Sequence, residues 1–178
     1  MTLVNLPTAD GRLAPYRLKG PRAWNGRDGR KFDRIALAAA HVVADPLADV
    51  DPWLTPAIDW DATLQFRRHL WSLGLGVAEA MDTAQRGMGL DWANARELIR
   101  RSVDAAKDIP GAVVFSGVGT EQLQPSRSVT VDDVIGAYEE QIEAVESLGG
   151  RIVLMASRAL VVAAKSPDDY AKVYGRIL

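Results

Sequence analysis

Apolar positions along residues 34–178 follow two alternating patterns. Short apolar runs, typical of strands buried on both faces of a parallel sheet, occupy residues 35–43, 77–81, 112–115 and 152–156, interrupted only by His41 and Glu79. The segments between these runs carry apolar residues at steps of three and four, as on one face of a helix. The clearest such stripe covers residues 131–148. Repeated strand and helix units predict an α/β fold with a parallel sheet.

Capping residues mark the starts of four predicted helices. Ser, Thr and Asp side chains accept hydrogen bonds from the free N–H groups of a first helical turn. Such residues precede each helical pattern, at Asp59, Asp91, Thr130 and Ser166. Asp133 stands where a capping box needs a carboxylate, and we expect a helix to begin directly after each cap.

The N-terminal residues differ from the rest of the chain. Residues 1–18 predict a small β-hairpin, because apolar residues flank Asp10-Gly11, a pair that tolerates the positive φ of a tight turn. Residues 19–33 are a polar connection. The predicted organisation is therefore a hairpin arm at 1–33 and an α/β domain at 34–178.

Four strand and helix units leave two architectures open. One is a doubly wound open sheet with helices on both faces, and the other is a (βα)8 TIM barrel, which needs eight units and roughly 250 residues. We predict the first four units of a barrel, a half-barrel with parallel strands in the order 1-2-3-4. Because the outer strands would be bare edges, we expect the missing C-terminal half of a longer polypeptide, or a second copy in a homo-oligomer, to complete the barrel.

Composition and charge exclude several classes of protein. With 178 residues and 48% apolar residues, the chain is long enough for a globular domain. Its 21 basic and 23 acidic residues are interspersed, so no basic stripe predicts binding to nucleic acid. No apolar run approaches the roughly 20 residues of a membrane span, and cysteine is absent. Without a secretion signal, the expected location is cytoplasmic.

The loop after the second strand carries the densest set of reactive side chains. Asp82, Thr83, Gln85 and Arg86 follow the strand directly. Parallel α/β folds bind ligands at the C-terminal ends of their strands. We therefore expect Asp82 and Thr83 in catalysis, and Gln85 and Arg86 in contact with a small-molecule substrate.

Two strand residues extend this candidate site. Alternation places Glu79 either toward the barrel interior or between sheet and helices, where an unpaired carboxylate is costly. We predict the interior, where Glu79 serves catalysis or pairs with Arg158 in a cleft. His41 ends the first strand and is either part of the site or a core histidine bonded to a backbone carbonyl.

Two glycines, Gly117 and Gly119, follow the third strand. They lack the third glycine and the immediate helix of a dinucleotide fingerprint, so we reject a nicotinamide cofactor. The remaining functional interpretation is close approach of the backbone to a small ligand.

Several segments resemble an uncharacterised bacterial family of about twice this length. They are Ala40–Pro46, Val77–Trp92, Ile152–Arg158 and Ser166–Gly175. That family is grouped with the dihydrodipicolinate synthase and N-acetylneuraminate lyase superfamily of TIM barrels. The resemblance implies that this chain is the N-terminal half of such a barrel.

In those enzymes a Gly-Thr-Thr-Gly-Glu loop binds the carboxylate of a 2-oxo acid. The matching stretch here is Met81–Gln85, in which Thr83 keeps the second threonine and Asp82 replaces the first with a charge that repels a carboxylate. Ser157 and Arg158 stand where the superfamily has a proton-relay tyrosine. The Schiff-base lysine of the superfamily lies on the sixth strand, outside this chain, so we expect the chain alone to be inactive.

Three functions remain open. The first is a lyase or aldolase that acts on a small polar, carbohydrate-derived carbonyl compound through an imine. The second is a metal-dependent barrel isomerase or aldolase that binds a divalent cation through His41, Glu79 and Asp82. The third is a non-catalytic half-barrel that assembles as a dimer. The candidate catalytic residues are His41, Glu79, Asp82 and Thr83, and the candidate substrate-binding residues are Gln85, Arg86, Gly117, Gly119, Ser157 and Arg158.

Overall fold

A computed structural model describes residues 2–20, 33–52 and 54–178. The described residues belong to two compact units, residues 2–20 and the residues from 33 onward. The polar connection expected at residues 19–33 falls largely outside the described part of the chain. The domain boundary after residue 33 stays a prediction.

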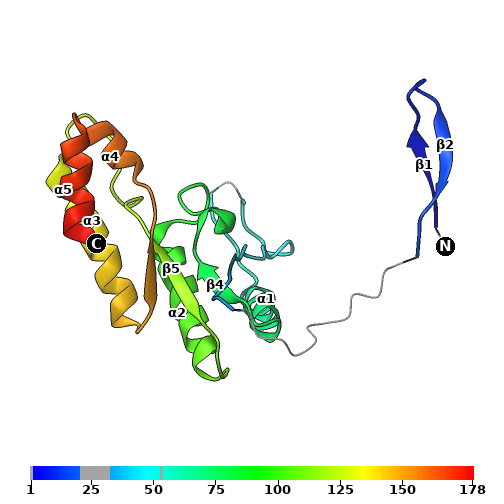
Figure 1. Cartoon of the computed structure of the whole chain (residues 1–178), viewed down its shortest axis with the longest axis horizontal. Helices are drawn as coiled ribbons and strands as arrows, with labels where there is room; N and C mark the ends of the chain where they lie inside the picture. The colour runs from blue at the N-terminus through cyan, green and yellow to red at the C-terminus, as the bar shows by residue number, and fades with distance from the viewer. Residues whose placement is uncertain (1, 21–32, 53) are drawn as a thin grey trace. The chain divides into compact units, whose positions relative to one another are not determined.

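The first unit is the hairpin that the Asp-Gly turn predicts (Figure 1). Strands β1 (Leu3–Pro7) and β2 (Leu13–Arg17) pair in antiparallel fashion. Gly11 has a φ of 77°, and its N–H donates to the Thr8 carbonyl at 2.9 Å. Glycine occupies this left-handed region without a steric penalty, which explains its place in the turn.

The second unit contains a four-stranded parallel sheet. Its strands are β3 (Leu37–Ala39), β4 (Gly76–Glu79), β5 (Val114–Val118) and β6 (Arg151–Leu154). They lie in the order β3-β4-β5-β6, with Ala38 opposite Val77 and Val77 opposite Val114. The predicted order of the strands is confirmed.

Strand β3 is shorter than the predicted run of residues 35–43. The Ala40 N–H still donates to the Ala78 carbonyl of β4 at 3.4 Å, but beyond it the backbone leaves the sheet and forms an antiparallel bridge, Ala44 opposite Ile58, with the segment that precedes the next helix. The Val43 N–H donates to Thr63 Oγ1 at 2.9 Å, and the Val43 carbonyl accepts from the Asp59 N–H at 2.9 Å. The segment before α1 and one hydroxyl of that helix therefore satisfy backbone groups that the apolar pattern assigned to a strand.

Five α-helices accompany the sheet in the described residues. They are α1 (Trp60–Ser72), α2 (Trp92–Lys107), α3 (Val131–Ser147), α4 (Arg158–Ala163) and α5 (Pro167–Ile177). The predicted caps are present, and Thr130 and Asp133 form the expected capping box. Helix α4 was not predicted, because a short and uniformly apolar segment shows no helical period. In the described part of the chain, no helix has both the length and the apolar character of a membrane span.

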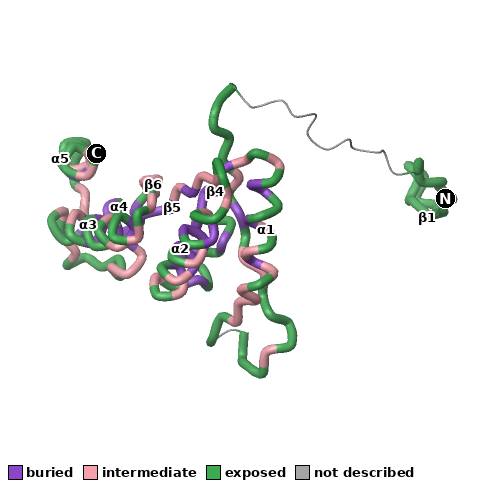
Figure 2. Tube along the Cα trace, turned by 90° about the horizontal axis from the view of Figure 1, so that it is seen from below, coloured by how far each residue is buried: buried purple, intermediate pink, exposed green. Residues whose placement is uncertain are grey.

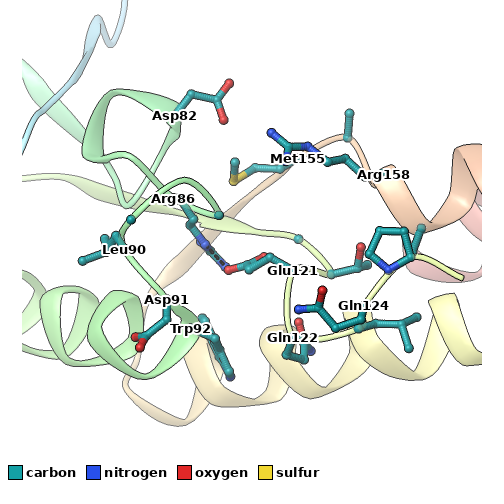
Figure 3. A pocket seen from close by; sticks show the side chains of 18 of the residues that line it. Asp82, Arg86, Leu90, Asp91, Trp92, Glu121, Gln122, Gln124, Met155 and Arg158 are labelled. Carbon is teal, nitrogen blue, oxygen red and sulfur yellow. Dashed lines mark hydrogen bonds and ion pairs between the residues drawn. The ribbon is translucent and has the colours of Figure 1, made fainter. Parts of the chain in front are cut away.

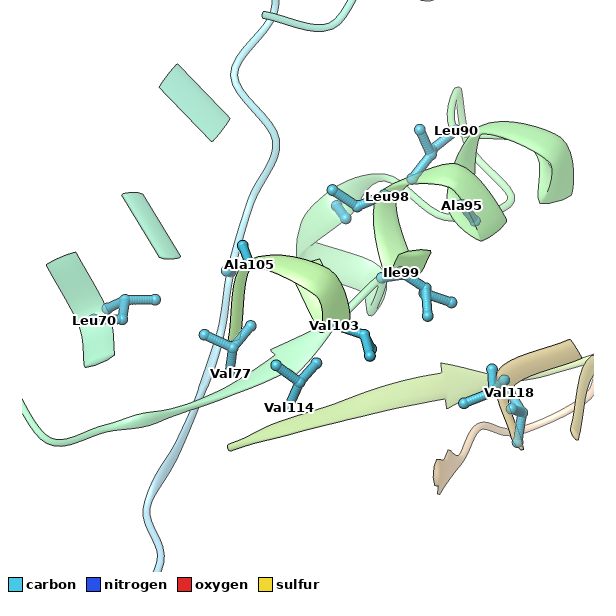
Figure 4. Close-up of a cluster of buried hydrophobic side chains, with 14 of the residues drawn as sticks. Leu70, Val77, Leu90, Ala95, Leu98, Ile99, Val103, Ala105, Val114 and Val118 are labelled. Carbon is cyan, nitrogen blue, oxygen red and sulfur yellow. The ribbon is translucent and has the colours of Figure 1, made fainter. Parts of the chain in front are cut away.

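The main core lies on one face of the sheet, against α1, α2 and α3. Val77, Val114 and Val118 point to this side and contact buried residues of α2 such as Leu98 and Ile99 (Figure 4). Buried residues gather where β4, β5 and α2 meet (Figure 2). Full burial of each such side chain contributes about 1.5–3 kcal/mol.

The opposite face of the sheet is open. Leu37, Phe115 and Val153 alternate with the core residues, and none of the described strand residues on this face belongs to the main core. Leu37 is 39% exposed, and the Arg151 guanidinium lies 5.5 Å from the centre of the Phe115 ring. A doubly wound sheet carries helices on both faces, so the arrangement is that of part of a barrel wall.

Helices α1 and α2 also meet through a charged cluster at their surface. The Arg101 guanidinium lies 4.3 Å from the centre of the Trp60 ring, and its Nε donates to Glu97 at 2.7 Å. Arg100 donates to the same carboxylate through Nε at 2.8 Å and Nη2 at 2.7 Å. The hydrogen bonds from Arg100 and Arg101 lower the pKa of Glu97 to about 2.

We expect the contribution of Glu97 to stability to depend on pH. Its pKa in the fold, about 2, lies below the ordinary value of 4.5, so the stabilisation is complete above pH 4.5 and is lost as the pH falls toward 2. Urea unfolding of the wild type and Glu97→Gln should show a stability gap that narrows from pH 6 to pH 3. Glu146→Gln, on an exposed position of α3, is the control. A gap of constant size would contradict this prediction.

Candidate functional site

A buried ion pair lies at the C-terminal end of β4, on the helix side of the sheet. Arg67 of α1 donates to Glu79 through Nε at 2.9 Å and Nη2 at 2.8 Å, and both side chains are fully buried. Ser102 of α2 donates to the same carboxylate at 2.5 Å. Arg67 Nη1 donates to the carbonyl of His41 at 2.6 Å. The pair therefore joins α1, β4, α2 and the end of β3.

The predicted orientation of Glu79 is wrong. We expected the barrel interior, in a cleft with Arg158, because a carboxylate between sheet and helices would lack a partner. Glu79 instead lies on the same face as Val77, and Arg67 supplies the partner. An ion pair between a helix and a strand leaves no local signal in the sequence.

The turn out of β4 is strained and is held from both sides. Ala80 has a φ of 52°, which is uncommon for a residue with a side chain. Its N–H donates to Glu79 Oε1 at 2.9 Å, and its carbonyl accepts from Arg86 Nη1 at 3.1 Å. Such conformations persist where the surroundings impose them, and they concentrate at functional sites. This turn begins the loop that carries Asp82.

Arg86 is the centre of a second buried network, between the loops after β4 and β5. Its side chain is 1% exposed, and its Nε donates to Glu121 at 2.5 Å. Nη1 also donates to the Gly117 carbonyl, and Nη2 donates to Gln141 Oε1. Burial lowers the pKa of Arg86, while the Glu121 carboxylate opposes that change. The guanidinium expected to bind substrate is thus engaged with acceptors of the protein itself.

The two glycines predicted to follow the third strand belong to the same network, although Gly117 lies within β5 and only Gly119 follows it. Gly119 donates its N–H to Gln141 Oε1 at 2.6 Å, so neither this N–H nor the Gly117 carbonyl is free for a ligand. A Cβ at Gly117 would lie 2.9 Å from the Ala80 carbonyl oxygen and 2.6 Å from Met155 Sδ. Glycine at this position therefore permits close packing of the C-terminal ends of strands β4, β5 and β6.

A pocket of about 630 Å³ lies at the C-terminal edge of the sheet, between the loops after β4, β5 and β6 (Figure 3). Its lining combines charged, amide and aromatic groups, including Asp82, Arg86, Trp92, Glu121, Gln122 and Arg158. This size suits a small molecule. The position is the edge at which barrel folds bind their substrates.

Buried hydroxyl groups hold the backbone on the β6 side of this pocket in place. The hydroxyls of Thr120 and Ser157 lie 2.6 Å apart, and Ser157 Oγ accepts from the Leu160 N–H at 3.0 Å as the cap of α4. The Tyr138 hydroxyl donates to the Met155 carbonyl at 2.5 Å, and burial raises the pKa of Tyr138. The start of α4 is therefore tied to β5 and α3.

The pocket brings together part of the predicted site. Asp82, Arg86, Gly119 and Arg158 line it, whereas Gln85 lines a separate cavity of about 430 Å³ beside the loop between β3 and α1. Gly117 and Ser157 are buried beneath the loops. The roles of these residues in binding or catalysis stay predictions.

His41 and Thr83 lie outside the lining of this pocket. His41 is exposed among the described residues, and its ring lies 4.6 Å from the ring of Phe66. The Thr83 hydroxyl lies 3.5 Å from the Ala40 carbonyl oxygen, which connects the loop after β4 with the end of β3.

The divalent-metal site proposed as an alternative is not formed. Among the described residues, no three His, Asp or Glu side chains come together as a possible metal site. Glu79 is held by Arg67 on the helix side, away from the exposed side chains of His41 and Asp82.

Sequence reasoning missed three residues that organise the site. Neither Arg67 nor Glu121 was singled out as a candidate. Gln141 did carry a signal, because it is a polar residue on the apolar stripe between Tyr138 and Val145. A buried amide on such a stripe needs hydrogen-bond partners, and here Oε1 accepts from Arg86 and from the Gly119 N–H while Nε2 donates to Gln122 Oε1 at 2.6 Å.

Comparison with known proteins identifies a family. The model of a family described as Protein of unknown function (DUF993) matches residues 4–178. No curated protein matched the chain.

Solved structures share the fold. A dihydrodipicolinate synthase from Bacillus clausii is 14% identical, with a TM-score of 0.52 over 80% of this chain and 42% of that chain. A dihydrodipicolinate synthase from Oceanobacillus iheyensis is 16% identical, with a TM-score of 0.51 over 81% of this chain and 41% of its own. The chain thus spans less than half the length of these structures. The likeness confirms the predicted barrel-type fold.

Removal of either member of the buried pair should destabilise the fold severely. Arg67→Met or Glu79→Leu leaves the other member of the pair buried and charged without its partner, at a cost of about 3–5 kcal/mol for a broken buried pair. The double variant Arg67→Met/Glu79→Leu should lose less than the sum of the two, because it leaves neither charge behind. Urea unfolding measures the three values. Arg68→Met, at an exposed position of α1, is the control, and additive losses would contradict the coupling.

Proposed function

This chain belongs to the family described as Protein of unknown function (DUF993), and we propose that the full-length protein is a TIM-barrel lyase or aldolase. In this proposal its substrate is a small polar, carbohydrate-derived carbonyl compound. The observation that carries the proposal is the pocket of Figure 3, at the C-terminal edge of a sheet with the strand order of a barrel. Barrel enzymes bind and convert their substrates at this edge.

The proposed chemistry needs an amine. A lysine that condenses with the substrate carbonyl forms an imine, which accepts the electron pair of the carbon–carbon bond that breaks. The lysines of the sequence are Lys19, Lys31, Lys107, Lys165 and Lys172. In the described part of the chain, no strand of the four-stranded sheet contains one. We therefore assign the imine to a lysine outside residues 1–178.

Asp82 is the proposed base. Cleavage of an aldol requires a group that takes the proton from a substrate hydroxyl. Asp82 is exposed, lines the pocket and, among the described residues, has no hydrogen bond to its carboxylate. The Thr83 hydroxyl lies 3.5 Å from the carbonyl oxygen of Ala40, the residue before His41, and we propose that Thr83 and His41 contact substrate once the barrel is complete.

The open face of the sheet supports a completed barrel. Leu37 and Phe115 would fill the interior of a closed barrel, and such side chains pack in layers there. We propose that the C-terminal half of a longer polypeptide covers this face. Closure by a second copy is the alternative, and it would appear as a stable dimer in sedimentation experiments.

Borohydride trapping of the full-length protein tests the proposed imine. After incubation with sugar-derived aldehydes and 2-oxo acids, reduction should leave a stable adduct on one lysine outside residues 1–178, which peptide mass spectrometry identifies. Asp82→Asn should still form the adduct but cleave substrate about 10²–10⁴-fold more slowly, because it removes a general base and not the amine.

Asp108→Asn is the matched control for this experiment. It removes the same charge at an exposed position, the C-cap of α2, which lies at the opposite end of that helix from the pocket. The control should retain wild-type rates. The absence of a lysine adduct across the whole panel, or adducts spread over surface lysines, would contradict the proposed function.

A further inference from the structure

Some charged side chains around the pocket have partners within the protein, and others have none among the described residues. Its charged lining residues are Asp82, Arg86, Asp91, Glu121 and Arg158. Arg86 and Glu121 neutralise each other at 2.5 Å. Asp91 caps α2, where it accepts from the N–H of Asn94 at 2.8 Å and from its side-chain amide at 2.9 Å. Three of the five charges are therefore satisfied within the protein.

Arg158 and Asp82 are the remaining charges. Both side chains are exposed, and among the residues that the structure describes neither has an ion pair or a side-chain hydrogen bond. Arg158 belongs to the β6 side of the pocket and Asp82 to the β4 side. Figure 3 shows them at one rim, where the guanidinium of Arg158 extends toward Asp82 above the side chain of Met155.

The backbone that carries Arg158 is fixed. Ser157, directly before it, is hydrogen-bonded to Thr120 and caps α4, and the Met155 carbonyl is bonded to Tyr138. A guanidinium on a fixed backbone at a pocket rim suits the two-oxygen geometry of a carboxylate or a phosphate. The charge of Asp82 disfavours the same anion at the β4 side.

We infer that the substrate of this site carries a carboxylate or phosphate group that Arg158 binds, and a hydroxyl group that faces Asp82. This inference rests on the proposed function, because it names the substrate class of the same pocket. It assigns the anion to the β6 side, opposite to the loop that the family resemblance indicated.

Binding of small anions to the full-length protein tests the inference without any imine chemistry. Sodium glycerate supplies a carboxylate with hydroxyls, inorganic phosphate supplies the other anion, and methyl glycerate is an uncharged counterpart. None of the three has a ketone or aldehyde. Calorimetry should show that glycerate, phosphate or both bind the wild type at least about tenfold more tightly than methyl glycerate, as a charge-assisted hydrogen bond predicts.

Variants at the two free charges separate the possible binding modes. Arg158→Gln should lower the affinity for the anion by about tenfold or more and leave the affinity for methyl glycerate unchanged. Arg158→Lys should retain part of the affinity, because it keeps the charge without the planar fork. Asp82→Asn should strengthen anion binding. Arg96→Gln removes a positive charge from an exposed position of α2 and should have no effect.

Two results would overturn the inference. In the first, the anion binds Arg158→Gln as tightly as it binds the wild type. In the second, neither glycerate nor phosphate binds the wild type more tightly than methyl glycerate does. Imine trapping reports separately on the proposed function. A lysine adduct combined with anion binding independent of Arg158 would remove only the inference, and Arg158-dependent binding without an adduct in any trial would remove only the lyase assignment.

Discussion

Buried charge must be neutralised where it lies, and the pair of Arg67 and Glu79 meets that requirement at the end of β4. An unpaired carboxylate between the sheet and its helices would cost several kcal/mol. Because the pair also bonds to Ser102 and to the carbonyl of His41, it fixes α1, α2 and the end of β3 around one point. The position of the loop after β4 depends on this interaction.

A second arginine extends the same principle toward the pocket. Arg86 bonds to the carbonyl of Ala80, whose N–H is bonded to Glu79, so the two buried networks hold one strained turn between them. Through Glu121 and Gln141 the network of Arg86 also reaches the loop after β5 and helix α3. The loops that form the pocket therefore rest on a connected set of buried hydrogen bonds, which is the kind of support that pre-organised sites require.

The fold and the site carry different information about function. Helices on one face and an open opposite face are the features of a barrel wall, but barrels support many unrelated reactions. The pocket adds a specific distribution of charge, in which Arg86 is neutralised by Glu121 whereas Asp82 and Arg158 have no ion pair among the described residues. In the proposed function, these two side chains and not the scaffold beneath them select the substrate.

Local chemistry in the sequence determined most elements of this fold, with the exceptions of α4 and of the length of β3. The caps at Asp59, Asp91 and Thr130 and the order of the strands could be predicted, because capping and hydrophobic period act within a few residues and short connections restrict the topology. Part of the pocket lining could also be predicted, since loops after parallel strands converge at one edge. Only the tertiary structure decided which face of the sheet the Glu79 side chain occupies and which protein groups the Arg86 guanidinium binds. Their partners Arg67 and Gln141 lie 12 and 55 residues away in the chain, and the free energy of a buried charge depends on which group folding brings beside it.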